Sequence, residues 1–288
     1  MKNIKRKPYK ETYGEKLLRA LHPAVLKVLT MATKSMPLRI EGRISLDGSK
    51  IFVANHFGID NIPTAGKVIR EHTYVLVSDE DKGTLNGLAL SMNGCIWVNR
   101  SNKTERKYSR EALIRHLQLG HNILMYPEAT WNLSPNLLML PMYWGCIELS
   151  QQTGIPIIPL YFYFTENACY VQINHPFYPY NDKTKSIVEL RDIMATSAWK
   201  FAEKYGKEKR KNIDQNYLKK DIDTRYRKYK RAFKDPIGVQ RYEEKFIFKP
   251  QGYVGYSEAF DFFQYLRIRK ENLFLFKDWM KYHSETDR

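Results

Sequence analysis

The sequence predicts an α/β fold: a mixed, mostly parallel sheet flanked by helices, with an N-terminal helical pair and a C-terminal appended lobe. Short runs rich in branched and aromatic residues recur through the first two thirds of the chain and are typical of buried strands. Helical patterns lie between several of them, and such alternation is typical of a sheet covered on both faces. The predicted strands are residues 50–54, 73–77, 95–98, 122–126 and 156–164.

Residues 13–36 form the first predicted helical unit, within an N-terminal segment that we place at residues 1–40. Leucine, valine and methionine recur in this unit at helical spacing. Pro23 is expected to divide it into a pair of helices, because proline lacks an amide donor and clashes with the preceding turn. Lysine and arginine residues precede the unit. A basic amphipathic segment can lie in a membrane interface or pack its apolar face on the protein, and the sequence leaves both open.

The main domain is predicted at residues 41–205. It holds the clearest helix of the chain at 104–119, where apolar residues recur at helical spacing and Gly120 provides the stop. Residues 206–288 form a basic, aromatic-rich extension, with 17 Lys and Arg against 8 Asp and Glu between positions 200 and 249. No Gly-Ser linker precedes this extension, so we expect an appended lobe and not a tethered free domain.

The composition bounds the class of protein and its partners. Hydrophobic residues make up 43% of the 288 residues, which excludes an intrinsically disordered protein. The 47 Lys and Arg exceed the 31 Asp and Glu and give a net charge of +16. This charge favours a polyanionic partner, either an anionic membrane surface, an acidic carrier protein or nucleic acid. No recognised DNA- or RNA-binding motif is present, so nucleic acid is an unlikely partner.

The cysteines and the apolar runs indicate the compartment. Cys95, Cys146 and Cys169 are odd in number and far apart, which predicts reduced, buried thiols and neither a disulfide framework nor a metal site. We find no apolar run of membrane-spanning length and no signal-peptide pattern. We therefore expect a cytoplasmic protein that binds peripherally to the cytoplasmic face of the membrane.

The most informative feature is the tripeptide Ala54-Asn55-His56, which directly follows the apolar run 51–53 and precedes Asp60. A strand that ends in this way can deliver an imidazole to a reacting hydroxyl, while a nearby carboxylate fixes the tautomer and the orientation of the ring. His56 is therefore a candidate general base.

Three further blocks follow along the chain, at residues 94–100, 126–130 and 155–159. The four blocks, in this order, resemble the glycerolipid acyltransferase superfamily, which includes the 1-acylglycerol-3-phosphate and lysophospholipid acyltransferases. The resemblance covers roughly residues 40–180. It implies transfer of a fatty acyl group from a thioester of coenzyme A or acyl carrier protein to the hydroxyl of a lysophospholipid or glycerol-phosphate-type acceptor in phospholipid synthesis, with 41–205 as the acyltransferase domain.

The resemblance also implies roles for individual residues. His56 is the general base, and Glu128 shapes the acceptor site and orients the first block. The family's aspartate position falls on Asn61, whereas Asp60 lies one residue earlier. Asparagine can orient the ring but cannot stabilise an imidazolium, so Asp60 is favoured and Asn61 remains the alternative. The residues implied in substrate binding are Gly94, Arg100, Glu128, Ala129, Thr130 and Pro159.

Two more positions depart from the family pattern. Ala129 stands where the family has glycine, and because alanine adopts a positive φ with difficulty, the local turn is expected to differ. Trp131 stands where the family has an arginine that would grip the acceptor's phosphate with two hydrogen bonds. This change weakens the case for lysophosphatidate as the acceptor and leaves Arg100 as the matched candidate for the phosphate.

The resemblance implies no metal and no prosthetic group, and the chain has no Gly-x-Ser-x-Gly motif, which predicts direct transfer without an acyl-enzyme. Two other hypotheses stand beside an active enzyme. One is a catalytically weakened relative that binds lipids or a partner, suggested by Asn61, Ala129 and Trp131. The other is a nucleic-acid-associated basic protein, suggested by charge alone.

Overall fold

The computed structural model describes residues 10–32, 36–56, 61–79, 82–129, 131–132, 138–140 and 142–206. The predicted C-terminal lobe therefore lies outside the described residues, except for Gly206. Asp60 and Thr130 also lie outside them.

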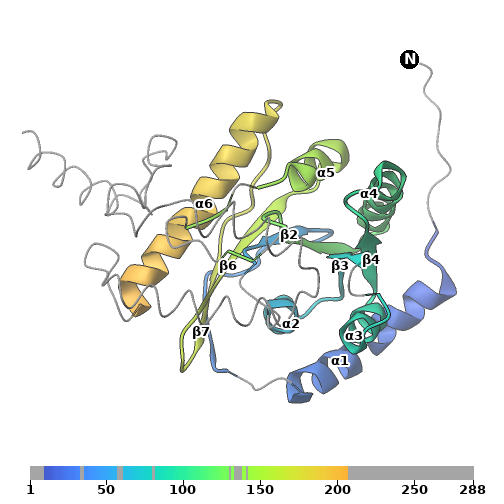
Figure 1. Ribbon diagram of the computed structural model, residues 1–288, viewed down its shortest axis with the longest axis horizontal. Coiled ribbons are helices and arrows are strands. Elements are labelled where there is room, and N and C mark those ends of the chain that lie inside the picture. The colour runs from blue at the N-terminus through green and yellow to red at the C-terminus, as the bar shows by residue number, and fades with distance from the viewer. Residues whose placement is uncertain are drawn as a thin grey trace, which may run out of the picture.

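A seven-stranded sheet forms the centre of this described part (Figure 1). Its strands are β1 Leu38–Glu41, β2 Ile51–Ala54, β3 Thr73–Ser78, β4 Cys95–Val98, β5 Asn122–Met125, β6 Ile157–Phe164 and β7 Cys169–Ile173. They lie in the order β1-β7-β6-β2-β5-β3-β4. Neighbours pair in parallel except β6 and β7, which are antiparallel. The prediction of a mixed, mostly parallel sheet is confirmed, and its five predicted strands correspond to β2 to β6.

Helices cover both faces of the sheet. One face carries α4 Lys103–Gln118, α5 Gly145–Thr153 and α6 Lys183–Tyr205, and the other carries α1 Tyr13–Ala32, α2 Asn61–Ile69 and α3 Leu85–Asn93 (Figure 1). Strand β2 has apolar side chains on both faces, and all of them are fully buried. Ile51 and Val53 point into the core beneath α4 to α6, and Phe52 and Ala54 point into the core beneath α2. A continuous apolar run of this kind is typical of a strand buried on both faces.

Helix α1 continues through Pro23, so the predicted N-terminal helical pair is a single helix. An internal proline costs a helix roughly 3 kcal/mol or more. Packing on both sides of Pro23 opposes this cost. His22 is buried, and Leu26 approaches Gly66 of α2 so closely that a Cβ at Gly66 would lie 3.0 Å from Leu26 Cδ1. No described helix is long and apolar enough to cross a membrane.

An ion pair and the contacts of two histidines hold the start of α1 against the sheet domain. Arg115 of α4 pairs with Glu15 of α1, and this pairing holds the pKa of Glu15 at about 2. His121 Nε2 lies 3.0 Å from an oxygen of Glu11, and its Nδ1 lies 3.1 Å from Nδ1 of His116. These contacts place α1 beside the starting ends of β3 and β5, away from the ends at which the candidate site forms.

Candidate active site

The candidate residues follow the carboxyl ends of three parallel strands, of which β2 and β5 are neighbours and β4 lies beyond β3. His56 lies two residues beyond β2, Glu128 three residues beyond β5, and Arg100 two residues beyond β4. Parallel strands end at one edge of a sheet, so their following loops converge there. Hydrogen bonds and an electrostatic contact join these loops in the structure.

Glu128 ties two chain segments together. Its side chain is buried, with Oε1 accepting from the backbone N–H of His56 at 3.0 Å and Oε2 accepting from the N–H of Leu140 at 2.8 Å. The backbone N–H of Asn132 donates in turn to the carbonyl oxygen of His56 at 2.9 Å. The backbone of His56 is therefore held on both its amide and its carbonyl. Glu128 positions the histidine without touching its ring in any described contact.

Burial raises the pKa of Glu128 to about 7, although the Leu140 and His56 amides and the charge of Arg191 act in the opposite direction. Arg191 belongs to α6 and donates from Nη2 to the carbonyl oxygen of Met139, next to Leu140, at 3.2 Å. A buried carboxylate without hydrogen bonds would cost far more free energy. The hydrogen bonds from the two amides and the positive charge of Arg191 offset part of the free energy that burial of this carboxylate costs.

The His56 ring lies against two aromatic side chains. Its centroid is 4.7 Å from that of Tyr126 and 6.2 Å from that of Trp131. Burial, together with the charge of Arg100, lowers the pKa of His56 to about 3, so the imidazole is neutral at physiological pH and can accept a proton. Its Nδ1 is buried and has no hydrogen-bond partner among the described residues.

Two asparagines fix the turn that presents His56. The side chain of Asn55 donates to the carbonyl oxygen of Phe162 at 3.1 Å and accepts from the Phe162 N–H at 2.8 Å, which fastens the end of β2 to β6. Asn61 is fully buried at the start of α2 and donates from Nδ2 to the carbonyl oxygen of Asn55 at 2.7 Å. An ionised aspartate has no donor to offer this carbonyl. Asn61 thus orients the backbone before His56, and no described contact joins it to the ring.

Ala129 adopts a left-handed backbone with φ of 59°, a conformation that alanine adopts with difficulty. The reason lies in the surrounding hydrogen bonds. The N–H of Ala129 donates to the carbonyl oxygen of Tyr126 at 2.9 Å, and Arg100 donates from Nη1 to the carbonyl oxygen of Ala129 at 2.6 Å. These bonds hold the turn in place against a left-handed strain of about 1–2 kcal/mol.

Gly94 and Pro159 do not join the other candidates. Gly94 precedes β4 and caps the carboxyl end of α3 with φ of 80°, at the opposite edge of the sheet from His56. A Cβ there would lie 3.0 Å from the ring of Tyr74, so glycine is required for packing. Pro159 is buried within β6 and pairs with Val53. Its carbonyl oxygen accepts a hydrogen bond from the N–H of Asn174 at 3.0 Å. In the described residues Gly94 caps α3 and Pro159 pairs within the sheet, and their assignment to substrate binding stays a prediction.

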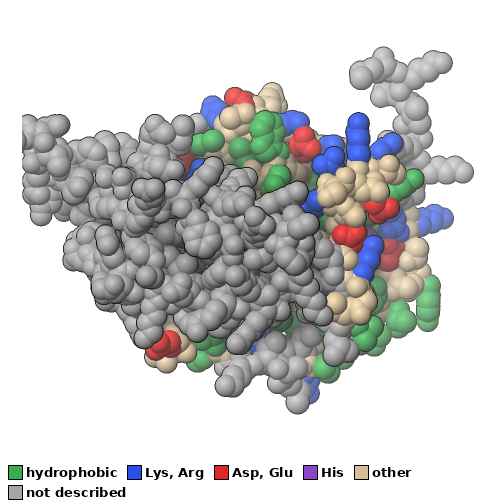
Figure 2. All heavy atoms as spheres, viewed as in Figure 1, with side chains coloured by type: hydrophobic (Ala, Val, Ile, Leu, Met, Phe, Trp, Pro, Cys, Tyr) green, Lys and Arg blue, Asp and Glu red, His purple; other side chains and the backbone are tan. Residues whose placement is uncertain are grey.

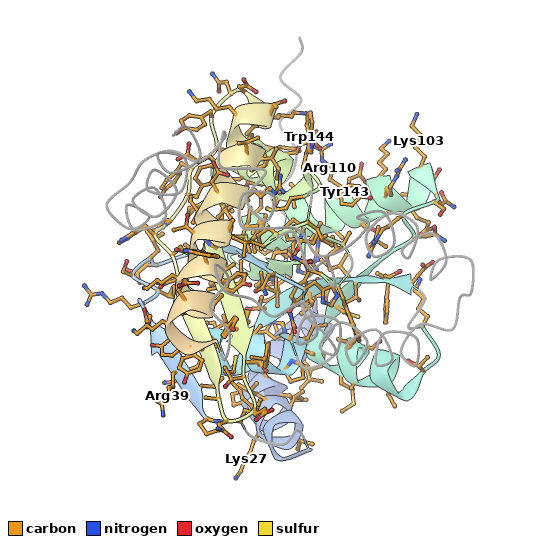
Figure 3. All side chains as sticks on the ribbon, turned by 60° about the vertical axis from the view of Figure 1, so that its left-hand side comes forward. Lys27, Arg39, Lys103, Arg110, Tyr143 and Trp144 are labelled. Atoms are coloured by element: carbon orange, nitrogen blue, oxygen red, sulfur yellow. The ribbon has the colours of Figure 1, made fainter. Side chains whose placement is uncertain are left out.

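Sequence reasoning missed several contributors to the site. The Leu140 amide and Arg191 carry no sequence signal, because a backbone donor is independent of residue type and α6 is remote in sequence. Exposed aromatic side chains also flank this edge, because Tyr143 and Trp144 directly precede α5, whose Glu148 lies 3.6 Å from Arg110 of α4. Lys103 projects from the start of α4 (Figure 3). The N–H of Tyr143 donates to the carbonyl oxygen of Pro127, which connects this surface to the Glu128 turn.

Two comparisons with known proteins agree with this geometry. Residues 37–163 match the protein-family model described as Acyltransferase. The fold is similar to the crystal structure of the 1-acyl-sn-glycerophosphate (LPA) acyltransferase PlsC from Thermotoga maritima, with a TM-score of 0.55 and 15% sequence identity. That match covers 66% of this chain and 83% of the other. No curated protein matches this chain.

The left-handed Ala129 predicts an unusual response to glycine. Ala129→Gly should raise the free energy of unfolding by about 0.5–1 kcal/mol, because glycine relieves the strain at this φ and the relief exceeds the extra entropy of the unfolded chain. Urea unfolding of the purified protein would measure the change.

The matched control is Ala20→Gly, at an exposed position inside α1, which should lower the free energy of unfolding by about 1 kcal/mol. Equal destabilisation by the two substitutions would contradict the assignment of strain to Ala129.

Proposed function

We propose that this chain transfers a fatty acyl group from a thioester to the hydroxyl of a lysophospholipid or glycerol-phosphate-type acceptor, and the match of residues 37–163 to the Acyltransferase family model supports the proposal. The observation that carries the proposal is the neutral imidazole of His56 at the carboxyl edge of the sheet, on a backbone whose N–H donates to Glu128. Phospholipid synthesis is the process that such a reaction serves.

In the proposed reaction the acceptor hydroxyl loses its proton to His56 as its oxygen attacks the thioester carbonyl carbon. The carbon–sulfur bond then breaks, and the thiol of the donor leaves with the proton that His56 returns. General-base catalysis of this kind is typically worth about 10² to 10⁴ in rate. We assign the proton transfer to Nε2, because Nδ1 is buried. The two substrates supply every atom of the reaction, so the proposal includes no cofactor.

A base with a pKa of about 3 needs an anion beside it to stabilise the imidazolium. We propose Asp60 for this role, opposite Nδ1. Asn61 remains the alternative: its Nδ2 donates to the Asn55 carbonyl oxygen, whereas its buried Oδ1 has no partner among the described residues. An amide oxygen could orient the ring but would not carry the negative charge that the imidazolium needs. Asp60 itself lies outside the described residues.

The acceptor and the donor are both anionic, and cations border the site on the side where β4 ends. Arg100 is exposed and holds the Ala129 turn, which supports it as the partner of an acceptor phosphate. Lys103 and Arg110 of α4, and the exposed rings of Tyr143 and Trp144 before α5, offer charge and stacking surface to the anionic head of the donor, either coenzyme A or an acidic carrier protein (Figure 3).

We further propose that α1 and α3 rest on an anionic membrane at the cytoplasmic face. The two helices contact each other. Large hydrophobic side chains gather over them at the lower right of Figure 2, and Lys16 of α1 is also exposed. An amphipathic helix with cations on its polar side favours an interface rich in anionic lipid. The exposed hydrophobic residues are Tyr13, Leu17, Leu21 and Val28 of α1 and Leu88 and Met92 of α3.

An acyl-transfer assay tests the proposed reaction. Purified protein is given palmitoyl thioesters of coenzyme A and of acyl carrier protein, with a panel of acceptors that do or do not carry phosphate. His56→Ala should lower kcat by about 10² or more, because it removes the base. His175→Ala is the control, since His175 is exposed beyond β7 at the other edge of the sheet.

Arg100→Ala, measured in the same panel, should raise the KM of phosphate-bearing acceptors and leave that of the phosphate-free ones unchanged. Full activity of His56→Ala at equal protein would overturn the base assignment. If Arg100→Ala instead lowers the rate of transfer equally with all acceptors, Arg100 acts only through the Ala129 turn.

Vesicle sedimentation tests the membrane surface. Binding should rise with the fraction of anionic lipid and fall with salt, because exposed charges are screened over about 8 Å at physiological ionic strength. Leu17→Glu with Leu21→Glu should abolish binding, whereas Tyr178→Glu, at an exposed aromatic after β7, should not. Binding that ignores lipid charge, together with tight, salt-dependent binding to DNA or RNA, would favour a nucleic-acid partner instead.

A further inference from the structure

Tyr126 carries a hydroxyl that the described protein leaves without a partner. The residue directly follows β5, and its ring lies 4.7 Å from the His56 ring with an angle of 33° between the planes. The hydroxyl oxygen is buried and has no hydrogen-bond partner among the described residues. A buried hydroxyl in this state destabilises a protein relative to a phenylalanine of the same shape. The position therefore suits a partner that arrives with the substrate.

The surroundings of Tyr126 indicate which kind of atom that partner is. Burial raises the pKa of Tyr126 far above its ordinary range, so its hydroxyl stays protonated and acts as a donor. The ring packs against the apolar cluster on the α2 face of the sheet, together with Ile62, Val77 and Phe164. A phosphate dianion is poorly accommodated in such surroundings. The carbonyl oxygen of a fatty acyl group suits this position, because it accepts a hydrogen bond and enters the site attached to an apolar chain.

We propose that Tyr126 is a catalytic residue whose hydroxyl donates a hydrogen bond to the thioester carbonyl oxygen as the acceptor attacks. This inference rests on the proposed function and adds a residue to it. When the new carbon–oxygen bond forms, the carbonyl electrons move onto that oxygen and the acceptor's proton passes to His56. When the carbon–sulfur bond breaks, the carbonyl reforms and His56 returns the proton to the sulfur. Tyr126 keeps its own proton throughout and stabilises the charge that develops on the oxygen.

The chain offers a matched control for removal of this hydroxyl. Tyr74, at the starting end of β3, also has a buried hydroxyl without a partner among the described residues. Its ring stacks on His116 with centroids 3.8 Å apart, at the edge of the sheet opposite to His56. Tyr74→Phe thus makes the same chemical change outside the candidate active site.

The test compares Tyr126→Phe and Tyr74→Phe with the wild-type chain, by thermal unfolding and by steady-state kinetics with the palmitoyl thioester and the acceptor that give the wild-type chain its highest rate in the panel above. Both variants should unfold at the wild-type temperature or above it, because each loses only an unpaired hydroxyl. Tyr126→Phe should lower kcat by about 10²-fold, the typical effect of removing one donor to a developing oxyanion. Its acceptor KM should not change, and Tyr74→Phe should retain wild-type kinetics.

Wild-type kcat in Tyr126→Phe would overturn the proposal. A rise confined to the acceptor KM would also overturn it, since the hydroxyl would then contact the acceptor. A drop in kcat accompanied by an equal drop in Tyr74→Phe would assign the effect to the fold. If the wild-type chain transfers no acyl group from either donor to any acceptor, the proposed function fails, and the role of Tyr126 fails with it.

Discussion

The candidate active site depends on one buried carboxylate. Glu128 accepts hydrogen bonds from the amides of His56, which is 72 residues away along the chain, and of Leu140, which is 12 residues away. Because β2 and β5 are neighbours in the sheet, the turn after β5 can reach the turn after β2. The cost of burying this carboxylate is visible in its pKa of about 7. Its hydrogen bonds offset part of that cost and fix the backbone from which the imidazole projects.

The three departures from the family pattern are compatible with this framework. Asn61 supplies a donor to the Asn55 carbonyl, which an ionised carboxylate would lack. Ala129 takes the left-handed conformation that glycine would take more easily, and Arg100 holds its carbonyl. Trp131 is buried near the His56 ring. In the described residues these side chains either donate hydrogen bonds to the turns around His56, adopt the required backbone or pack beside the ring.

Much of the fold could be predicted from the sequence, because buried parallel strands leave continuous apolar runs. Strands β1 and β7 escaped prediction because neither is a continuous buried run: β1 is partly exposed at the edge of the sheet, and alternate residues of β7 are only half-buried. The break expected at Pro23 was wrong because packing of α1 outweighed the local effect of proline. For the site, the predicted strand ranges already leave His56, Arg100 and Glu128 just beyond strand ends, and the structure places them beyond β2, β4 and β5. Gly94 lies before β4 and Pro159 within β6, and membership of a block does not reveal where along a strand a residue falls.

Hydrogen exchange of the His56 and Leu140 amides in Glu128→Gln tests this account most directly. A glutamine offers one oxygen to the two amides and turns its NH2 group toward the other donor. The account predicts that at least one of the two amides exchanges about ten-fold faster or more than in the wild-type chain, while the Phe162 amide, held by Asn55, keeps its protection. Unchanged protection of both amides in the variant would contradict the claim that Glu128 holds the active-site turn.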